Sequence, residues 1–160
     1  MRVVVSDAGP LICLGRLDLL RLLPALFAEV QVPDRVLLEC LSRWQSPDAA
    51  RINTAVVLGW LTACGPQRMI EGTLGRGERA AIARALAIGA GLLTDDQDAR
   101  VYAESLQLKV VGTLGVLIRS KHAGLVPYVA PLINQLRAGG QRFGRAVVAQ
   151  ALSAAGEAPE

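Results

Sequence analysis

The sequence predicts an α/β fold in which helices flank a mainly parallel sheet. Short aliphatic runs alternate with segments of helical spacing along most of the 160 residues. Hydrophobic residues make up 52% of the chain and aromatic residues only 4%, so the core is expected to consist of Leu, Val, Ile and Ala. We expect one domain over residues 1–155 whose parallel strands are joined by right-handed crossovers.

In the first third of the chain, aliphatic runs and the residues that interrupt them define the elements. The β-branched run of Val3 to Val5 stops at Asp7-Ala-Gly-Pro, which indicates a strand followed by a turn. We predict strands over 1–6 and 27–32, a helix over 11–14 with Pro10 in its first turn, a helix over 19–23 opened by Asp18, and a helix over 35–43 capped by Asp34.

The remaining elements follow from caps, glycines and aliphatic periodicity. Ser46 is a good helix N-cap, residues 72–77 form a glycine-rich connector, and Gly89 ends the alanine-rich helix before it. We predict strands over 59–64, 92–94 and 108–111, helices over 46–57, 78–88 and 98–106, a helical C-terminal portion over about 113–155 with helices at 113–122, 127–138 and 144–154, and a frayed tail over 156–160.

Acidic side chains follow two of the predicted strands at the point where each strand ends. Asp7 follows the first strand, and Asp95, Asp96 and Asp98 follow the strand over 92–94. Because the carboxyl ends of parallel strands meet at one edge of the sheet, these acids are expected to lie together. Glu39 lies on a helix that follows a strand, and Glu78 opens a helix after a glycine-rich turn. Both side chains are expected to extend to the same edge.

Converging carboxylates repel one another unless a cation lies among them. Carboxylate oxygens suit hard cations such as Mg²⁺ or Mn²⁺, and such a cluster is the equipment for metal-assisted phosphodiester hydrolysis. The only histidine, His122, lies near a helix end, which leaves little for a histidine-based mechanism.

Each acid also has a purely structural interpretation. Asp7 is able to begin an Asx-turn, Glu39 to lie on a solvated helix face, and Glu78 to complement a helix N-terminus. Asp98 is the most natural N-cap of its group and the weakest candidate. Three acids within four residues are more than one helix cap requires, so the run from Asp95 to Asp98 favours a functional site.

Net charge and cysteine content indicate which partners and which cellular compartment to expect. The net charge of +3 and pI of about 9.1 agree with a polyanion partner without establishing one. Three cysteines without metal-ligand spacing indicate small buried side chains in a reducing cytoplasm. We find no signal peptide and no apolar run of about 20 residues, so we expect a cytoplasmic protein without membrane contact.

Taken in order, these segments resemble the PIN-domain family. The resemblance rests on Val-Val-Val-Ser-Asp7-Ala-Gly-Pro-Leu-Ile, on Val32-Pro33 followed by Val36-Leu-Leu-Glu39, on Leu74-Gly-Arg-Gly-Glu78-Arg-Ala-Ala, and on Leu92-Leu-Thr-Asp95-Asp96-Gln-Asp98. The segment Lys109-Val-Val-Gly-Thr-Leu-Gly-Val-Leu resembles a short subgroup of unknown function. The match covers roughly residues 1–137, and its ordered combination is more specific than any single motif.

The resemblance implies a PIN-like three-layer α/β/α sandwich and a metal-dependent ribonuclease that cleaves single-stranded RNA with Mg²⁺ or Mn²⁺. It assigns the catalytic and metal-binding acids to Asp7, Glu39, Glu78, Asp95 and Asp96, with Asp98 as a weaker ligand. Many members are toxins of toxin–antitoxin pairs that form homodimers and are silenced by a small antitoxin. Two departures are Glu78, where many toxins have Asp, and Ala8, where a polar residue is frequent.

Three functional hypotheses follow. The first is a metal-dependent endoribonuclease that is the toxin of a toxin–antitoxin pair. The second is a PIN-like regulator of low or no activity that binds RNA or a partner. The third, a receiver-like phosphoacceptor module, fits poorly because Asp7 stands alone after its strand and Lys109 begins its strand rather than ending it.

Overall fold

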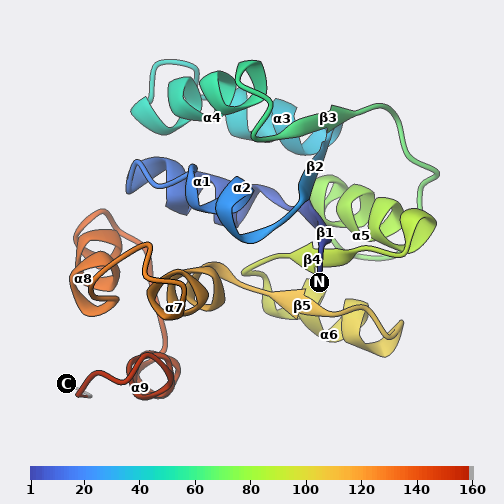
Figure 1. Ribbon diagram of the computed structural model, residues 1–160. Coiled ribbons are helices and arrows are strands. Elements are labelled where there is room, and N and C mark those ends of the chain that lie inside the picture. Colours follow the sequence, from blue (N-terminus) through green and yellow to red (C-terminus); the bar gives the residue numbers. More distant parts are fainter. Residues whose placement is uncertain (159–160) are drawn as a thin grey trace. The chain divides into compact units, whose positions relative to one another are not determined.

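A computed structural model describes residues 1–158 and separates two compact units, one of residues 1–113 and one from Leu114 onward (Figure 1). In the first unit, five parallel strands form one sheet in the order β3-β2-β1-β4-β5. The strands are β1 (Val3–Ser6), β2 (Glu29–Pro33), β3 (Thr62–Cys64), β4 (Gly91–Leu93) and β5 (Val110–Val111). The predicted α/β fold with a mainly parallel sheet is confirmed.

Helices connect the strands of the first unit. They are α1 (Ala8–Arg16), α2 (Leu22–Leu26), α3 (Asp34–Leu41), α4 (Pro47–Val57), α5 (Arg76–Ile88) and α6 (Gln97–Ser105). The helices α1, α3 and α4 pack together, and α5 packs against α3, α6, β1, β2 and β4. In Figure 1, α1 and α2 lie on one side of the sheet and α5 and α6 on the other. This arrangement gives the three layers that the sequence predicts.

The central strands are fully buried because helices cover both faces of the sheet. Val4, Val5, Leu92 and Leu93 are at most 1% exposed. The register pairs Val5 with Leu92 and Ser6 with Leu93, so β1 and β4 end side by side. Strands buried on both faces carry continuous aliphatic runs, which explains why these segments show no alternation with polar residues.

Three predicted caps are wrong. Asp34 does not cap its helix: it is the first residue of α3, its side chain accepts a hydrogen bond only from the adjacent Arg35 N–H, and Pro33 occupies the N-cap position. Asp18 does not open a helix: its backbone is left-handed at φ 55°, it follows the end of α1, and the next helix begins at Leu22. Asp98 does not cap α6, because Asp96 is the N-cap and accepts a hydrogen bond from the Ala99 N–H. The predicted Ser46 cap of α4 is confirmed.

The second unit contains most of α7 (Thr113–His122), together with α8 (Ala130–Ala138) and α9 (Arg145–Ala154). The carboxylate of Glu157 accepts hydrogen bonds from the backbone N–H groups of Val129 and Ala130 at 2.7 and 3.0 Å. It also pairs with Lys121 at 3.0 Å. Glu157 is therefore held in place, and the predicted frayed tail does not begin at residue 156; residues 159–160 lie outside the described residues.

Two further expectations concern the whole chain. Cys13 and Cys40 are buried, as predicted, whereas Cys64 is half-buried. Within residues 1–158, none of the helices combines the length and hydropathy that crossing a membrane requires.

Candidate active site

Asp7 lies where the chain leaves β1 and enters α1. It is 5% exposed, has an extended backbone and is the N-cap of α1. Its Oδ1 accepts a hydrogen bond from the Ala8 N–H at 2.8 Å, and its Oδ2 accepts one from the Thr94 hydroxyl at 3.0 Å. From β1, the strands β2 and β3 are added on one side of the sheet and β4 and β5 on the other, so the strand order switches between β1 and β4. Open α/β sheets bind ligands at such a switch point, and Asp7 lies there.

The environment of Asp7 disfavours its charged form. Burial, together with the negative charges of Glu78 and Glu39, raises the pKa of Asp7 to about 7, against the partial compensation of the hydrogen bonds from Ala8 and Thr94. Burying a carboxylate near other carboxylates lowers the free energy of unfolding. Such arrangements are frequent in functional sites.

Glu39 from α3 and Glu78 from α5 border the same space as Asp7. A β-carbon at Gly77 would lie 2.8 Å from Glu39 Oε2 and 3.7 Å from Asp7 Oδ1. Gly77 therefore leaves room for both carboxylates at the start of α5. The pKa of Glu78 is raised, first by burial and then by the charges of Asp96 and Glu39. Four of the predicted acids thus act on one another.

Glu78 also has the structural role that the sequence allows. Gly75 is the N-cap of α5, and Glu78, three residues later, accepts a hydrogen bond from the Gly75 N–H. This is the return half of a capping box. The Glu78 side chain lies directly against Gly75, where a β-carbon would collide with it. The glycine-rich connector thereby fixes the position of Glu78.

The three acids after β4 have three different surroundings. Asp96 caps α6 and faces Glu78. Asp95 points elsewhere: its Oδ1 accepts from the Thr113 N–H at 2.7 Å and its Oδ2 from the Thr113 hydroxyl at 2.5 Å. Asp98 lies exposed in the first turn of α6. The structure therefore brings Asp96 to Glu78 and ties Asp95 to the start of α7.

Thr94 belongs to the site and was missed by the sequence analysis. It is fully buried, and its hydroxyl donates a hydrogen bond to Asp7 Oδ2. The hydroxyl oxygen of Thr94 in turn accepts a hydrogen bond from the Asp96 N–H at 3.2 Å. One hydroxyl thus links the ends of β1 and β4. The available signal was a polar residue that ends the otherwise aliphatic strand after Leu92 and Leu93.

The donor chemistry of this cluster fits a hard divalent cation. Asp7, Glu39, Glu78 and Asp96 offer only oxygen ligands, and the pKa of Asp7 is raised by burial and, less strongly, by neighbouring carboxylates whose charge a cation would balance. Within residues 1–158, no three His, Cys, Asp or Glu side chains stand close enough together to form a ready-made metal-binding group.

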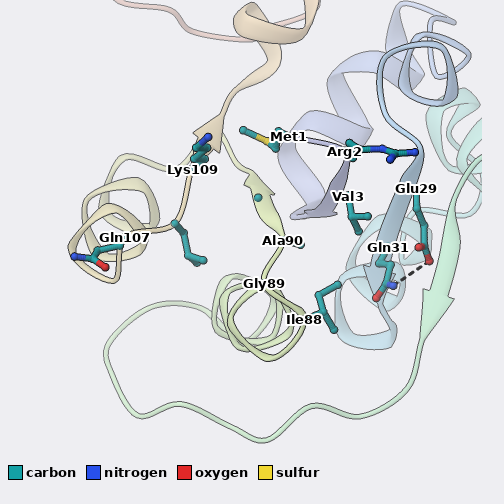
Figure 2. Close-up of a pocket in the computed structure, with 12 residues that line it drawn as sticks. Met1, Arg2, Val3, Glu29, Gln31, Ile88, Gly89, Ala90, Gln107 and Lys109 are labelled. Atoms are coloured by element: carbon teal, nitrogen blue, oxygen red, sulfur yellow. Dashed lines mark hydrogen bonds between the residues drawn. The ribbon is translucent and has the colours of Figure 1, made fainter.

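A cavity of about 620 Å³ lies at the opposite, amino edge of the sheet (Figure 2). Its lining includes Arg2, Glu29, Gln31 and Lys109 but none of the candidate acids. Glu29 accepts a hydrogen bond from Gln31, whose side-chain oxygen accepts one from Arg84. Opposite charges are mixed at this edge, whereas like charges gather at the other.

Comparison with known proteins identifies relatives of this fold. A family model described as DUF3368, a PIN domain, matches residues 3–157. A PilT N-terminus domain protein from the hyperthermophilic archaeon Sulfolobus solfataricus P2 is similar with a TM-score of 0.52 at 18% identity, over 75% of this chain and 93% of that chain. A domain of a functionally unknown protein from Methanocaldococcus jannaschii has a TM-score of 0.49 at 12% identity, over 70% and 91%. A search of curated protein sequences found no match.

Proposed function

This chain belongs to the PIN-domain family, and on that basis we propose that it is an endoribonuclease that cleaves single-stranded RNA with Mg²⁺ or Mn²⁺. PIN domains are in general metal-dependent nucleases. The observation that carries the proposal is that the charges of Asp7, Glu39, Glu78 and Asp96 act on one another in pairs at the carboxyl edge of the sheet, where Asp7 and Glu78 have raised pKa values. A purely structural role does not explain why several carboxylates are placed together.

The residues divide the work by position. Asp7 is buried and held through both carboxylate oxygens, so it provides a fixed ligand. Glu39 is exposed, and Glu78 and Asp96 sit at helix starts, where each also accepts a backbone hydrogen bond. We assign these three to the more open side of the metal site. A bound divalent cation supplies charge to polarise the phosphate and to lower the pKa of a water molecule. We assign Asp95 to positioning the start of α7, and Asp98 has the weakest claim to metal binding.

The proposed biological role is that of the toxin in a type II toxin–antitoxin pair, acting in the cytoplasm as a homodimer and inhibited by a small antitoxin. The support for this role is family resemblance alone. A small DNA-binding protein encoded directly upstream would favour it. A second indication would be growth arrest on expression of the wild-type chain but not of an Asp7→Asn variant.

The capping role of Glu78 favours a second candidate, a PIN-like regulator that binds RNA or a partner without efficient cleavage. In that case Glu78 is retained for the stability of α5 rather than for a metal. Mn²⁺ titration separates the two candidates. The nuclease requires Mn²⁺ binding that weakens in both Asp7→Asn and Glu39→Gln, whereas the regulator shows no such dependence.

The decisive test is RNA cleavage by Asp7→Asn. We expect purified wild-type chain with Mn²⁺ to cut an unstructured RNA, and the variant to be slower by roughly a thousandfold, about 4 kcal/mol of activation free energy. Asn keeps the side-chain shape and removes the charge that a cation would bind, although its NH2 group replaces one of the two oxygens that accept hydrogen bonds from Ala8 and Thr94. Asp18→Asn is the matched control, because Asp18 is exposed and its left-handed backbone suits Asn. Equal cleavage by all three proteins would place the active site elsewhere.

A further inference from the structure

Charge is divided unequally between the two compact units. Residues 1–113 contain twelve basic and twelve acidic side chains, whereas residues 114–160 contain five basic and two acidic ones. The formal net charge of +3 therefore resides entirely in the helical C-terminal part of the chain. A concentration of positive charge on one part of a protein is the usual electrostatic sign of a polyanion partner.

Within the second unit, the positive charge borders a cavity. The cavity has a volume of about 510 Å³ and is lined by Arg137 at the end of α8, by Arg145 at the start of α9, and by the small side chains of Ala146, Val148 and Ala149. Arg142 lies in the short segment between these two helices and is exposed. Small aliphatic walls leave space beside the guanidinium groups.

Helix electrostatics accounts for some of these cations but not for all. Arg119, Lys121 and Arg137 lie in the last turns of α7 and α8, where positive charge complements the helix dipole. Lys121 is further neutralised by Glu157. Arg145, by contrast, is the first residue of α9, and Arg142 lies three residues before it. A cation there opposes the dipole, so the stability of α9 does not explain these two arginines.

We propose that Arg137, Arg142 and Arg145, the basic surface, bind the phosphodiester backbone of single-stranded RNA. This inference rests on the proposed ribonuclease function and adds to it a place where substrate is held outside the carboxylate cluster. Guanidinium groups bind phosphate oxygens in a planar, two-point geometry. The adjoining cavity gives a nucleotide room beside its phosphate, which an extended acidic peptide does not require, and its volume lies within the range of ligand sites.

The test measures RNA binding separately from cleavage. The full chain is titrated into a labelled oligouridine of about 20 nucleotides in EDTA, at several salt concentrations, for wild type and for R142Q/R145Q. Each lost phosphate contact lowers the dependence of log affinity on log salt by about 0.7 for a single strand. We expect the slope to fall by about 1.4 and the affinity at about 100 mM salt to fall roughly tenfold or more.

Arg21→Gln/Arg43→Gln is the matched control, because it removes the same charge from exposed positions in residues 1–113. Equal losses in both double variants would overturn the proposal, since only net charge would matter. Binding of polyglutamate as tight as that of oligouridine would also overturn it and would identify an acidic protein as the partner. Circular dichroism checks folding; if the double variant does not fold, R142Q and R145Q are tested singly, each with half the expected loss of slope.

Cleavage assays with Mn²⁺ separate this inference from the proposed function. If R142Q/R145Q binds RNA more weakly and the wild type does not cleave RNA, the proposal of the basic surface is supported and the proposed nuclease function is overturned. If the wild type cleaves RNA and R142Q/R145Q binds it as tightly as the wild type, the proposed nuclease function is supported and only the proposal of the basic surface is overturned.

Discussion

The two edges of the sheet differ in which charged side chains lie near one another. At the carboxyl edge, the negative charges of Asp7, Glu39 and Glu78 act on one another, and none of the ion pairs found within residues 1–158 includes them. At the amino edge, Glu29 shares its cavity with Arg2 and Lys109 (Figure 2). Mixed charge is what folding stability alone would select. Crowded like charge lowers stability, so its presence at one edge only indicates selection for something other than the fold.

The largest expected effect is on the pH dependence of stability. Asp7 has an ordinary pKa of 3.8 when unfolded and about 7 when folded. Between these values the folded chain keeps a proton that the unfolded chain has lost, so the free energy of unfolding falls as pH rises from about 4 to about 7. A difference of this size corresponds to roughly 4 kcal/mol. Glu78, also with a raised pKa, contributes in the same direction.

Urea unfolding in EDTA at about pH 4.5 and pH 8 measures this effect. Asp7→Asn should lose most of the pH dependence and be the more stable protein at pH 8, while Asp18→Asn should keep the wild-type profile. Identical profiles for wild type and Asp7→Asn would show that Asp7 ionises normally, and the contrast between the two edges would disappear.

A smaller effect is expected from Thr94→Val, which keeps the shape of a fully buried residue and removes its hydroxyl. Asp7 Oδ2 and the Asp96 N–H would each lose a partner, at a cost of about 1–3 kcal/mol in unfolding free energy. The pKa of Asp7 should rise further, because the hydroxyl hydrogen bond lowers it. The transition in the urea–pH profile should therefore move to higher pH.

Thr62→Val in the exposed part of β3 is the matched control and should change stability by less than about 0.5 kcal/mol. If Thr94→Val lowered stability without moving the Asp7 transition, Thr94 would be a core residue with no influence on the acid.

The smallest stability effect belongs to Gly77→Ala. The new β-carbon would lie 2.8 Å from Glu39 Oε2, so the exposed Glu39 side chain must move. Alanine favours the helix by up to about 1 kcal/mol, which offsets the local crowding and keeps the free energy of unfolding nearly constant. Mn²⁺ affinity, measured by calorimetry, should fall by roughly tenfold, or about 1.4 kcal/mol.

Gly65→Ala serves as the control, since a β-carbon at Gly65 meets no atom within 4 Å. Unchanged Mn²⁺ affinity in Gly77→Ala would remove Glu39 from the candidate metal ligands. Fewer carboxylates would then share the metal with Asp7 than we propose.

Most of the fold was predictable because aliphatic runs and helix caps are local signals. Val3 to Val5 and Leu92 to Leu93 form strands, and α7 spans the predicted residues 113–122. The errors arose where several residues were equally suited to one role. Asp96 and Asp98 are both able to cap α6, and only the point where the chain leaves β4 decides between them. Asp18 resembled a cap, but its place after α1 requires a left-handed turn.

The candidate site was predictable in its acids and less so in its geometry. Parallel strands bring their carboxyl ends together, which places Asp7 and Asp96 at one edge from sequence alone. The direction of Asp95 towards Thr113 depends on how β5 leads into α7, a tertiary contact with no local signature. Thr94 was missed because a single hydroxyl in an aliphatic strand is usually a packing residue.

The strand order has a consequence for how the protein is made. β1 is synthesised before the other four strands and is the middle of the finished sheet, with β2 on one side and β4 on the other. Its three valines have no second neighbouring strand until about ninety further residues, as far as Leu93, have been synthesised. During that interval the edge of β1 that β4 will cover is open to other chains. Asp7, at its end, is therefore synthesised long before Thr94, the residue whose hydroxyl binds its carboxylate.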